Sequence, residues 1–343
     1  MARIGILNGG GDCPGLNAAI RAVVRKGVEH YGDAIIGFRN GYRGLLEGSA
    51  VDLTPESVRG ILHRGGTILG TSRADPFRVD GGLDLLRGTM ATSRLDGLIV
   101  IGGEGTLSTA AKLSAEGFPV VGVPKTIDND LAGTDYTFGF DTAVQIATDA
   151  IDRLHTTAES HNRVMLLEVM GRQSGWIALH AGLAGGADVI LIPEHPFDVS
   201  EVCHHIRHRH ARGHFFSIVV VAEGAFPVEG TMEVPEYERD EFGRPRLGGI
   251  SNAIAREIQH LTGFDTRVTI LGYVQRGGSP TAYDRVLATR LGIAAVDLAS
   301  TDRWGRMVAL RGQEIVDVPL DDAVTQLKRV PEELYRVAEV FFG

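Results

Sequence analysis

One pattern recurs along the chain: a short run of β-branched and other apolar residues, then a Gly-rich or polar turn, then a helical segment. The first copy is the run Arg3–Leu7, the turn 8–15 and a predicted helix from about Asn17 to Gly27. Continuous apolar runs that alternate with helices are typical of parallel strands buried on both faces. The pattern therefore predicts an α/β fold with mainly parallel sheets covered by helices.

Five more strand-and-turn units follow the first one. They are Leu98–Ile101 with the turn 102–106, Val120–Val123 with 124–130, Val164–Val169 with 170–172, Ile218–Val221 with 223–224, and Val268–Leu271 with 273–278. The strands form one group before about residue 140 and another after about residue 160, which predicts two Rossmann-like lobes that face each other. Ligands of such sheets bind at the carboxyl ends of the strands, so we expect the polar turns to share one cleft.

The sequence of two further segments predicts their local structure. Asp141 is a suitable N-cap for a predicted helix Thr142–Leu154, because its side chain can accept a hydrogen bond from a free amide of the first turn. Residues 225–249 are rich in Pro, Glu, Gly and Arg, and we interpret them as a surface insertion.

Composition narrows the class of protein. Of the 343 residues, 43% are hydrophobic and 22% are charged, which is typical of a globular chain. The N-terminus lacks a signal-peptide pattern and no apolar stretch reaches ~18 residues, so we expect a cytoplasmic protein with no membrane contact. Cys13 and Cys203 lack the spacing of a disulfide framework or a zinc site. A formal net charge of −9 argues against nucleic acid as a partner and means that any phosphate site must be locally positive.

Two Gly-rich turns are candidates for binding phosphate. The turn Gly9–Gly11 precedes a helix, where free amides attract anions, but a tight strand-to-helix turn without a ligand explains it equally well. The turn Gly102–Thr106 adds a carboxylate, Glu104, and so offers a nucleotide a close backbone and Mg²⁺ a hard oxygen ligand. Lipid kinases and nicotinamide-dinucleotide kinases have a similar turn, so it favours a kinase without naming the substrate.

The turn 124–130 is the most specific segment, because it places a lysine, a hydroxyl and two carboxylates after one buried strand. Phosphoryl transfer to an alcohol requires a base near the hydroxyl, donors on the moving phosphoryl group and a metal ion. Asp128 can be the base, Thr126 a donor and Lys125 a charge clamp. Considered alone, the segment is also compatible with a solvated Asx-rich turn.

Six motifs then appear in order along nearly the whole chain: 10–18 (GGDCPGLNA), 64–67 (RGGT), 102–106 (GGEGT), 126–130 (TIDND), 168–172 (EVMGR) and 275–278 (QRGG). Together they closely resemble those of the 6-phosphofructokinases. The resemblance implies the phosphofructokinase fold and Mg²⁺-dependent transfer of the γ-phosphate of ATP to the 1-hydroxyl of fructose 6-phosphate, a reaction of glycolysis. It implies a donor-nucleotide lobe of residues 1–139 plus 275–325, and a fructose-6-phosphate lobe of residues 140–274 plus 326–343.

Roles for single residues follow from the same resemblance. Asp128 would be the general base, with Thr126 on the transferring phosphoryl group and Arg172 near it. The donor-binding residues would be Gly10, Arg73, Ala74, Gly103, Glu104, Gly105 and Thr106, with Glu104 as the Mg²⁺ ligand. The acceptor-binding residues would be Thr126, Ile127, Asp128, Arg163, Met170, Gly171, Arg172, Glu223, Arg267, Tyr273, Val274, Gln275 and Arg276. Arg163 and Arg267 would come from a neighbouring subunit, which implies self-association as a homotetramer or homodimer.

The chain departs from the family pattern at the positions that distinguish phosphoryl donors. Pyrophosphate users usually have Asp at the position of Gly105 and Lys at the position of Lys125, whereas ATP users usually have Gly at both. This mixed pair is typical of an actinobacterial-like group. An Asp at 105 would intrude on the α-phosphate of a nucleotide, so we favour ATP and keep pyrophosphate as the alternative donor.

Three other departures concern single roles. Glu104 stands where most ATP-dependent members have Asp, which keeps the ligand type and lengthens the side chain by one methylene. Tyr273 stands where His is usual, so it can donate to a phosphate but carries no positive charge near neutral pH. Arg21 and Arg25 match part of the basic effector cluster of many bacterial members, but the segment 212–216 lacks its lysines, so an effector site of the usual form is not expected.

Rival interpretations remain for particular features. The His-rich tract 204–214 has His204/His208 and His210/His214 at i,i+4 spacing, which suits incidental metal binding, but we favour a solvated helix face. Cys13 lies near a helix start, where a thiolate is stabilised and a redox role is compatible, but we favour a small buried filler. A dinucleotide-binding oxidoreductase is disfavoured because Asp33 does not end a second strand, and a non-catalytic sugar-phosphate sensor is disfavoured by Asp128.

Overall fold

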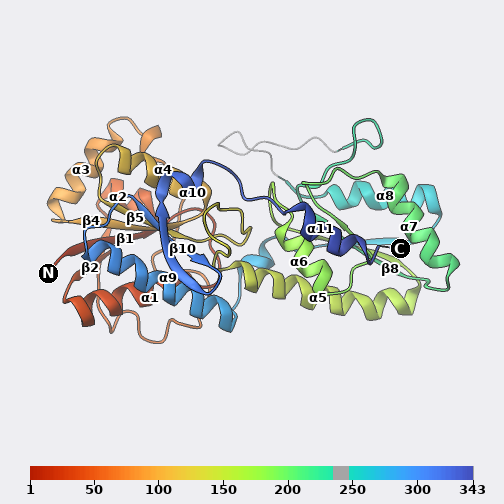
Figure 1. The fold of residues 1–343 in the computed structure, drawn as a ribbon, viewed down its shortest axis with the longest axis horizontal. Coiled ribbons are helices and arrows are strands. Elements are labelled where there is room, and N and C mark those ends of the chain that lie inside the picture. The colour runs from red at the N-terminus through yellow and green to blue at the C-terminus, as the bar shows by residue number, and fades with distance from the viewer. Residues whose placement is uncertain (235–246, 343) are drawn as a thin grey trace. The chain divides into compact units, whose positions relative to one another are not determined.

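The computed structural model describes residues 1–234 and 247–342, and it divides the chain into two compact units (Figure 1). The first unit comprises Met1–Thr142 and Arg276–Leu327, and the second comprises Ala143–Gln275 and Lys328–Gly343. Each unit has its own sheet, so the predicted α/β fold with mainly parallel sheets covered by helices is confirmed. No described helix is both long and apolar enough to span a membrane.

The sheet of the first unit has seven strands in the order β11-β10-β5-β4-β1-β2-β3. Its five central strands run parallel, and they are β10 (Arg306–Arg311), β5 (Val120–Pro124), β4 (Gly97–Gly102), β1 (Arg3–Asn8) and β2 (Ala34–Phe38). The edge strands β11 (Glu314–Pro319) and β3 (Ala50–Leu53) pair antiparallel. Every residue of β4 and β5 is buried, as expected for strands covered on both faces.

Helices cover both faces of this sheet (Figure 1). On one face lie α1 (Leu16–Arg25), continued by a π-helix (Lys26–Tyr31), and α9 (Ala282–Ser300). Gly292 lets α1 and α9 pack closely, because a Cβ there would lie 2.8 Å from the Ala19 carbonyl oxygen. The other face packs against α2 (Tyr42–Glu47), α3 (Gly82–Thr92), α4 (Glu104–Ala115) and α10 (Leu320–Val324). A short 3-10 helix, Pro76–Arg78, precedes α3.

The second unit contains a wholly parallel sheet of four strands in the order β7-β8-β6-β9. The strands are β6 (Val164–Val169), β7 (Val189–Leu191), β8 (Ser217–Ala222) and β9 (Thr266–Ile270). The helices are α5 (Phe140–His161), α6 (Trp176–Ala184), α7 (Val199–Ala211), α8 (Ile250–Thr262) and α11 (Glu332–Glu339). Apolar residues of α7 and α8 form one core cluster with β6, β7 and β8.

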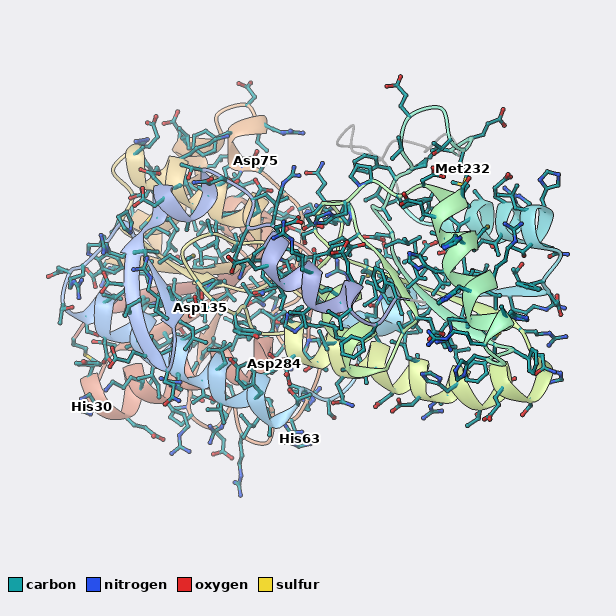
Figure 2. The ribbon with its side chains drawn as sticks, turned by 45° about the vertical axis from the view of Figure 1, so that its right-hand side comes forward. His30, His63, Asp75, Asp135, Met232 and Asp284 are labelled. Atoms are coloured by element: carbon teal, nitrogen blue, oxygen red, sulfur yellow. The ribbon has the colours of Figure 1, made fainter. Side chains whose placement is uncertain are left out.

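The predicted cap at Asp141 is wrong, because α5 begins at Phe140 and Asp141 lies inside its first turn. The capping oxygen comes instead from Asp284, in the first turn of α9 (Figure 2). Its Oδ2 accepts the backbone N–H of Thr142 at 2.9 Å, and the Asp141 carboxylate accepts the Thr281 hydroxyl at 2.6 Å. The helix also continues to His161, seven residues beyond the predicted end. Of the predicted insertion 225–249, residues 235–246 lie outside the described residues.

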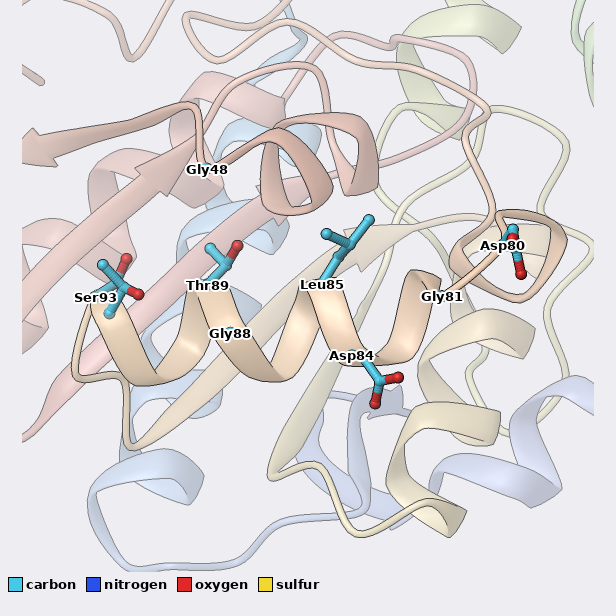
Figure 3. Close-up of a pocket in the computed structure, with 9 residues that line it drawn as sticks. Gly48, Asp80, Gly81, Asp84, Leu85, Gly88, Thr89 and Ser93 are labelled. Atoms are coloured by element: carbon cyan, nitrogen blue, oxygen red, sulfur yellow. The ribbon is translucent and has the colours of Figure 1, made fainter.

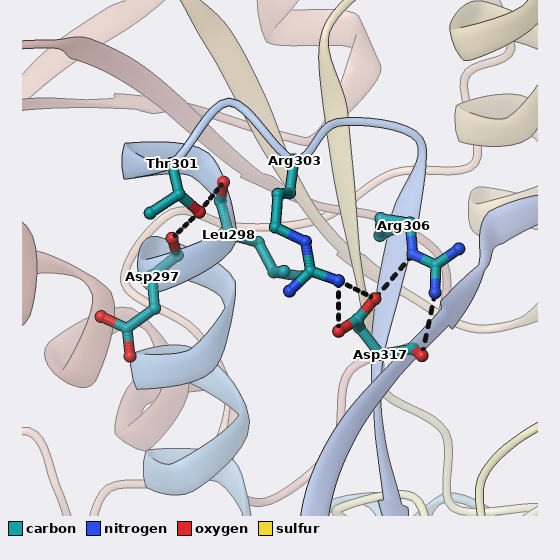
Figure 4. Close-up of polar contacts among 6 residues, drawn as sticks. All are labelled: Asp297, Leu298, Thr301, Arg303, Arg306 and Asp317. Atoms are coloured by element: carbon teal, nitrogen blue, oxygen red, sulfur yellow. Dashed lines mark hydrogen bonds and ion pairs between the residues drawn. The ribbon is translucent and has the colours of Figure 1, made fainter.

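Two surface features of the first unit lie away from the glycine turns. A shallow hollow runs along α3 from Asp80 to Ser93, with Gly48 at its side (Figure 3). The antiparallel pair β10 and β11 is joined by Asp317, whose carboxylate accepts hydrogen bonds from Arg303 at 2.7 Å and from Arg306 at 2.6 Å (Figure 4). Neither feature includes a residue of the turns at 8–15, 102–106 or 124–130.

Candidate active site

The turns after β1, β4 and β5 lie together at the carboxyl edge of the first sheet. The Gly9 amide donates to the Ile101 carbonyl at 2.9 Å, and the Lys125 amide donates to the Gly102 carbonyl at 2.9 Å. These bonds continue the sheet ladder into the turns, so their positions follow from the strand order. The structure therefore brings together the predicted donor-binding turns 9–11 and 102–106 and the predicted catalytic turn 124–130.

The first glycine turn is fixed by the segment that precedes Arg73. Gly10 has φ 80°, a left-handed conformation that favours glycine. Its amide donates to the Ser72 carbonyl at 2.9 Å, and its carbonyl accepts the Thr71 hydroxyl at 2.6 Å. Arg73 and Ala74 consequently follow directly beside this turn, and Arg73 has an exposed side chain.

Thr106 holds the first and second glycine turns at contact distance. A Cβ at Gly9 would lie 2.5 Å from the Thr106 side chain, and a Cβ at Gly102 would lie 2.3 Å from it. Both glycines are therefore required by close packing around one buried threonine. The Tyr42 hydroxyl donates to the Thr106 carbonyl at 3.1 Å, which secures the first turn of α4 from the other side.

The start of α4 is open to solvent. Glu104 and Gly105 are the first two residues of the helix, and both are exposed. The Glu104 carboxylate accepts the Ser108 hydroxyl at 3.2 Å, which leaves its other oxygen for a cation. Exposed amides at a helix N-terminus attract anions, so this turn suits a phosphate with its metal ion.

Lys125 is almost fully buried, with 2% of its surface exposed. Its ammonium donates to the carbonyl of Gly9 at 3.0 Å and to the carbonyl of Gly11. Burial lowers the pKa of Lys125, because desolvation disfavours the charged form. The predicted charge clamp thus holds the backbone of the first glycine turn in this structure.

The catalytic turn is fixed by the returning segment 134–138. The Thr137 hydroxyl donates to the Thr126 carbonyl at 2.7 Å, and its amide donates to Asn129 Oδ1 at 3.1 Å. The Asp128 amide donates to the Thr126 hydroxyl at 3.1 Å, and Asp128 itself is 4% exposed. Ile127 is buried and anchors the turn. Thr126 and Asp128 therefore occupy defined positions. Such positions are required of a hydroxyl that donates a hydrogen bond to a phosphoryl group and of a carboxylate that acts as a base.

In the second unit, the turn after β6 is strained and well anchored. Gly171 has φ 145° and Arg172 has φ 54°, which is uncommon for a residue with a side chain. The Arg172 amide donates to the Glu223 carboxylate at 3.1 Å, and the Glu223 amide donates to the Val169 carbonyl at 2.8 Å. A Cβ at Gly224 would lie 1.8 Å from the Arg172 carbonyl oxygen, so only glycine fits there. Met170, Gly171, Arg172 and Glu223 thus form one constellation.

Arg163 and Arg267 are not part of that constellation. Arg163 precedes β6 and Arg267 is the second residue of β9, so both lie at the amino ends of these parallel strands, whereas residues 170–172 follow the carboxyl end of β6. Both arginines bind the Asp265 carboxylate, and the Arg163 hydrogen bond, at 2.6 Å, lowers the pKa of Asp265 most. Two guanidinium groups on one exposed carboxylate form a positive surface suited to a phosphate.

The last predicted group is a short 3-10 helix, Gly272–Arg276. Tyr273 is 79% exposed and Val274 is also exposed, whereas Gln275 is fully buried and donates to the Gly272 carbonyl at 3.2 Å. Arg276 donates to the Asp12 carbonyl at 3.3 Å and lies against Gly11, where a Cβ would be 2.6 Å from its Nη1. Arg276 therefore contacts the first glycine turn.

Several acids that hold helix starts were not identified from the sequence. Glu168 is 1% exposed and accepts the amides of Gly249 at 2.7 Å and Ser251 at 3.0 Å, so it caps α8. Asp284 and Glu194 hold helix starts in the same way. A single acid inside an apolar run, as in 164–169, is the sequence signal that points to Glu168.

The remaining sequence candidates have structural roles. Cys13 is fully buried and burial raises the pKa of its thiol to about 12, so it is protonated at neutral pH and packs as a filler. The His-rich tract lies on and after α7, where His204 and His208 are exposed and His210 stacks on Phe264. Across residues 1–234 and 247–342, no group of three or more His, Cys, Asp or Glu side chains is arranged to hold a metal. Asp33 precedes β2, as expected if it is not a ribose ligand.

Two α/β units with glycine turns at the carboxyl ends of parallel strands are typical of the α/β proteins that bind phosphorylated ligands at this edge. Residues 3–299 match the family model described as "Phosphofructokinase", and the chain belongs to this family. Its activity is accordingly that of a phosphofructokinase.

Close relatives have names that specify two different phosphoryl donors. A protein of Amycolatopsis methanolica named pyrophosphate–fructose 6-phosphate 1-phosphotransferase is 58% identical over 99% of this chain and 100% of its own length. A protein of Mycobacterium bovis named ATP-dependent 6-phosphofructokinase is 56% identical over the same shares of the two chains. The Pichia pastoris phosphofructokinase structure in the T-state matches with a TM-score of 0.84 and 33% identity, over 99% of this chain and 36% of that one. The comparisons therefore leave the donor open.

Proposed function

We propose that the chain transfers the γ-phosphate of ATP to the 1-hydroxyl of fructose 6-phosphate, giving fructose 1,6-bisphosphate and ADP. The observation that best supports ATP as the donor is the exposed start of α4, where Gly105 places no side chain beside the open helix amides. A nucleotide extends beyond its β-phosphate, so it needs room at this point that pyrophosphate does not need. Gly105 keeps that room free.

The position of Lys125 also supports ATP. A lysine that binds a terminal phosphate of pyrophosphate must present its ammonium to the ligand. Here the ammonium is buried and donates to the carbonyls of Gly9 and Gly11. We assign Lys125 to holding the first glycine turn, and Gly105 to admitting the nucleotide.

Mg²⁺ fits the residues at this edge of the sheet. Glu104 is exposed and has one carboxylate oxygen beyond its contact with Ser108, and Mg²⁺ usually takes one or two protein carboxylates with phosphate oxygens and water. Bound there, the ion would neutralise charge on the donor phosphates. The sequence difference from Asp to Glu preserves the oxygen ligand.

The chain's own groups then supply the transfer chemistry. Asp128 accepts the proton of the 1-hydroxyl as that oxygen attacks, and the hydroxyl of Thr126 donates to the transferring phosphoryl group. Arg172 is assigned to the transferring phosphoryl group, which suits a planar guanidinium. Gly10, Arg73, Ala74, Gly103 and Thr106 hold the donor.

The acceptor is bound by the second unit in this proposal. Met170, Gly171, Arg172 and Glu223, which form one constellation, bind the sugar, and the segment 273–276 completes the pocket. The Arg163 and Arg267 pair lies at the opposite end of the strands, which supports its assignment to the 6-phosphate of a neighbouring copy in a homodimer or homotetramer. The expected location is the cytoplasm.

Pyrophosphate is the second candidate donor, favoured by the names of relatives that are 57–58% identical and by the presence of Lys125. A coupled assay with fructose 6-phosphate at matched free Mg²⁺ separates the two donors. We expect kcat/KM for ATP to exceed that for pyrophosphate. If the enzyme used pyrophosphate but not ATP, pyrophosphate would replace ATP as the assigned donor, and fructose 6-phosphate would remain the acceptor.

A further inference from the structure

The turn 170–175 connects β6 to α6 and is anchored at both of its ends. At its start, the Glu223 carboxylate accepts the Arg172 amide at 3.1 Å. At its end, the Gly175 amide donates to the Glu194 carboxylate, with distances of 3.1 Å to Oε1 and 3.0 Å to Oε2. Glu194 follows β7 and belongs to the same carboxyl edge of the second sheet. Two acids from two different strand ends therefore fix one turn.

Glu194 acts on the start of α6 from outside that helix. Gly175 is the N-cap residue of α6 and has no side chain with which to cap it. A Cβ at Gly175 would lie 2.3 Å from Ile192 Cβ and 2.9 Å from Glu194 Oε2, so glycine is required for the carboxylate to approach. A negative charge at a helix N-terminus is stabilising because it satisfies free amides and opposes the helix dipole.

Glu194 also binds the C-terminal segment 328–342. The Val330 amide donates to Glu194 Oε1 at 3.0 Å. Two residues earlier, the Lys328 carbonyl accepts the indole N–H of Trp176, the first residue of α6, at 2.9 Å. Further on, the Tyr335 hydroxyl donates to the Ile190 carbonyl of β7 at 3.1 Å. The C-terminal segment thus contacts both the start of α6 and the strand that carries Glu194.

We propose that Glu194 is a positioning residue that holds the turn 170–175 in its binding conformation and makes the C-terminal segment part of the acceptor site. The inference rests on the proposed role of Met170–Arg172 in binding the sugar phosphate. Arg172 has a left-handed backbone, which persists only when neighbouring contacts hold it. Glu194 supplies the contact at one end of the turn, and Val330 fixes Glu194.

The first test compares Glu194→Ala with Glu194→Gln in the full-length enzyme. Glu194→Ala leaves the Gly175 and Val330 amides without their acceptor, and we expect KM for fructose 6-phosphate to rise about tenfold or more. Glu194→Gln keeps one carbonyl oxygen and is expected to restore most of that affinity. KM for the phosphoryl donor should change by less than about twofold in both variants, because the donor turns lie in the other unit.

Asp188 provides a matched control at the opposite end of β7. Its carboxylate accepts the Ile218 amide at 2.8 Å and pairs with Arg209 at 2.9 Å, so Asp188→Ala also removes a carboxylate that accepts a backbone amide in the second unit. We expect Asp188→Ala to lower the melting temperature without raising KM for fructose 6-phosphate. An equal rise in that KM in both variants would reduce Glu194 to a general stabiliser and overturn the proposal.

The second test addresses the C-terminal segment without truncating it. Val330→Pro removes the amide that donates to Glu194 and also restricts the backbone at this position, whereas Val330→Ala keeps this amide and shortens the same buried side chain. We expect KM for fructose 6-phosphate to rise in Val330→Pro and to stay near wild type in Val330→Ala. Equal KM values for fructose 6-phosphate in the two variants would show that the C-terminal segment does not contribute to the acceptor site.

The same assay separates this inference from the proposed function. If wild-type enzyme phosphorylates fructose 6-phosphate but Glu194→Ala has a normal KM, the role of Glu194 is wrong and the function stands. If wild-type enzyme fails to phosphorylate fructose 6-phosphate with either ATP or pyrophosphate, the proposed function is wrong and the inference falls with it.

Discussion

Asp284 accepts two hydrogen bonds from Thr142, one from the backbone amide at 2.9 Å and one from the hydroxyl at 2.5 Å. The Thr142 hydroxyl in turn accepts the Thr281 amide at 3.1 Å. The starts of α5 and α9 are therefore joined by one buried carboxylate. Thr142 is also the last residue of the first stretch of unit one, and the following residues of α5 belong to the second unit.

Asp284 predicts a specific dependence of stability on pH. Burial raises the pKa of Asp284 from 3.8 to about 6, and the Thr142 hydrogen bonds oppose this rise. The folded state therefore holds this proton more tightly than the unfolded state, and the resulting stabilisation is complete below pH ~4 and is lost as pH rises through ~6. A shift of about two units corresponds to about 3 kcal/mol of unfolding free energy.

The variant Asp284→Asn tests this prediction because it cannot ionise and keeps a carbonyl acceptor for Thr142. Urea denaturation of both proteins between pH 4 and pH 7 gives the difference in unfolding free energy. We expect the variant to gain stability relative to wild type as pH rises. A difference that is constant across this range would show that Asp284 does not titrate in it.

Packing around Thr106 predicts a rescue of one substitution by another. Gly9→Ala would place a Cβ 2.5 Å from both the Cγ2 and the Oγ1 of Thr106, and such overpacking costs about 1–3 kcal/mol of unfolding free energy. Thr106→Ala added to Gly9→Ala removes both of these atoms and leaves the Cβ of residue 106 as the nearest one, at 3.1 Å. Urea denaturation should show the double variant to be more stable than Gly9→Ala alone, and additive losses would contradict the packing argument.

Removal of the proposed base predicts a loss of turnover without loss of the fold. Asp128→Asn is expected to lower kcat at least about 10²-fold, because general-base catalysis contributes about 10² to 10⁴. Steady-state kinetics measure this effect, and circular dichroism checks that the variant is folded. Turnover near that of wild type would remove Asp128 from the role of base.

Gly105→Asp tests the steric basis of the donor assignment. A carboxylate at the open start of α4 would occupy space beside the α-phosphate of ATP and repel it, so we expect kcat/KM for ATP to fall at least about tenfold. Activity with pyrophosphate, where present, should fall less. Gly105→Ala is the control for a small uncharged side chain at the same position. ATP kinetics that Gly105→Asp leaves unchanged would refute the steric argument.

A substitution far from the candidate site should lower the stability of the protein without an effect on catalysis. Asp317→Ala removes the acceptor shared by Arg303 and Arg306 on the β10 and β11 pair. We expect a loss of about 1 kcal/mol, typical of one partly exposed charged network. Thermal melting should detect this loss, while KM for both substrates stays at the wild-type value.

Residue patterns along the chain were enough to predict the fold class and the location of the turns. Runs such as Leu98–Ile101 are apolar at every position, and only strands covered on both faces bury such runs completely. Because parallel strands end at one edge, the order of strands and turns also indicated that 9–11, 102–106 and 124–130 would meet. These features depend on local residue pattern and on general rules of sheet topology, so no contact between distant residues had to be known.

Contacts between residues far apart in the chain could be identified only in the folded structure. Asp284 caps α5 across 142 positions of sequence, which is why the local rule that chose Asp141 failed. Lys125 binds two carbonyls of the first turn instead of facing outward, and Glu194 anchors both Gly175 and Val330. Such partners are chosen by the distances that remain once sheets and helices have packed, and a residue pattern along one segment carries no information about those distances.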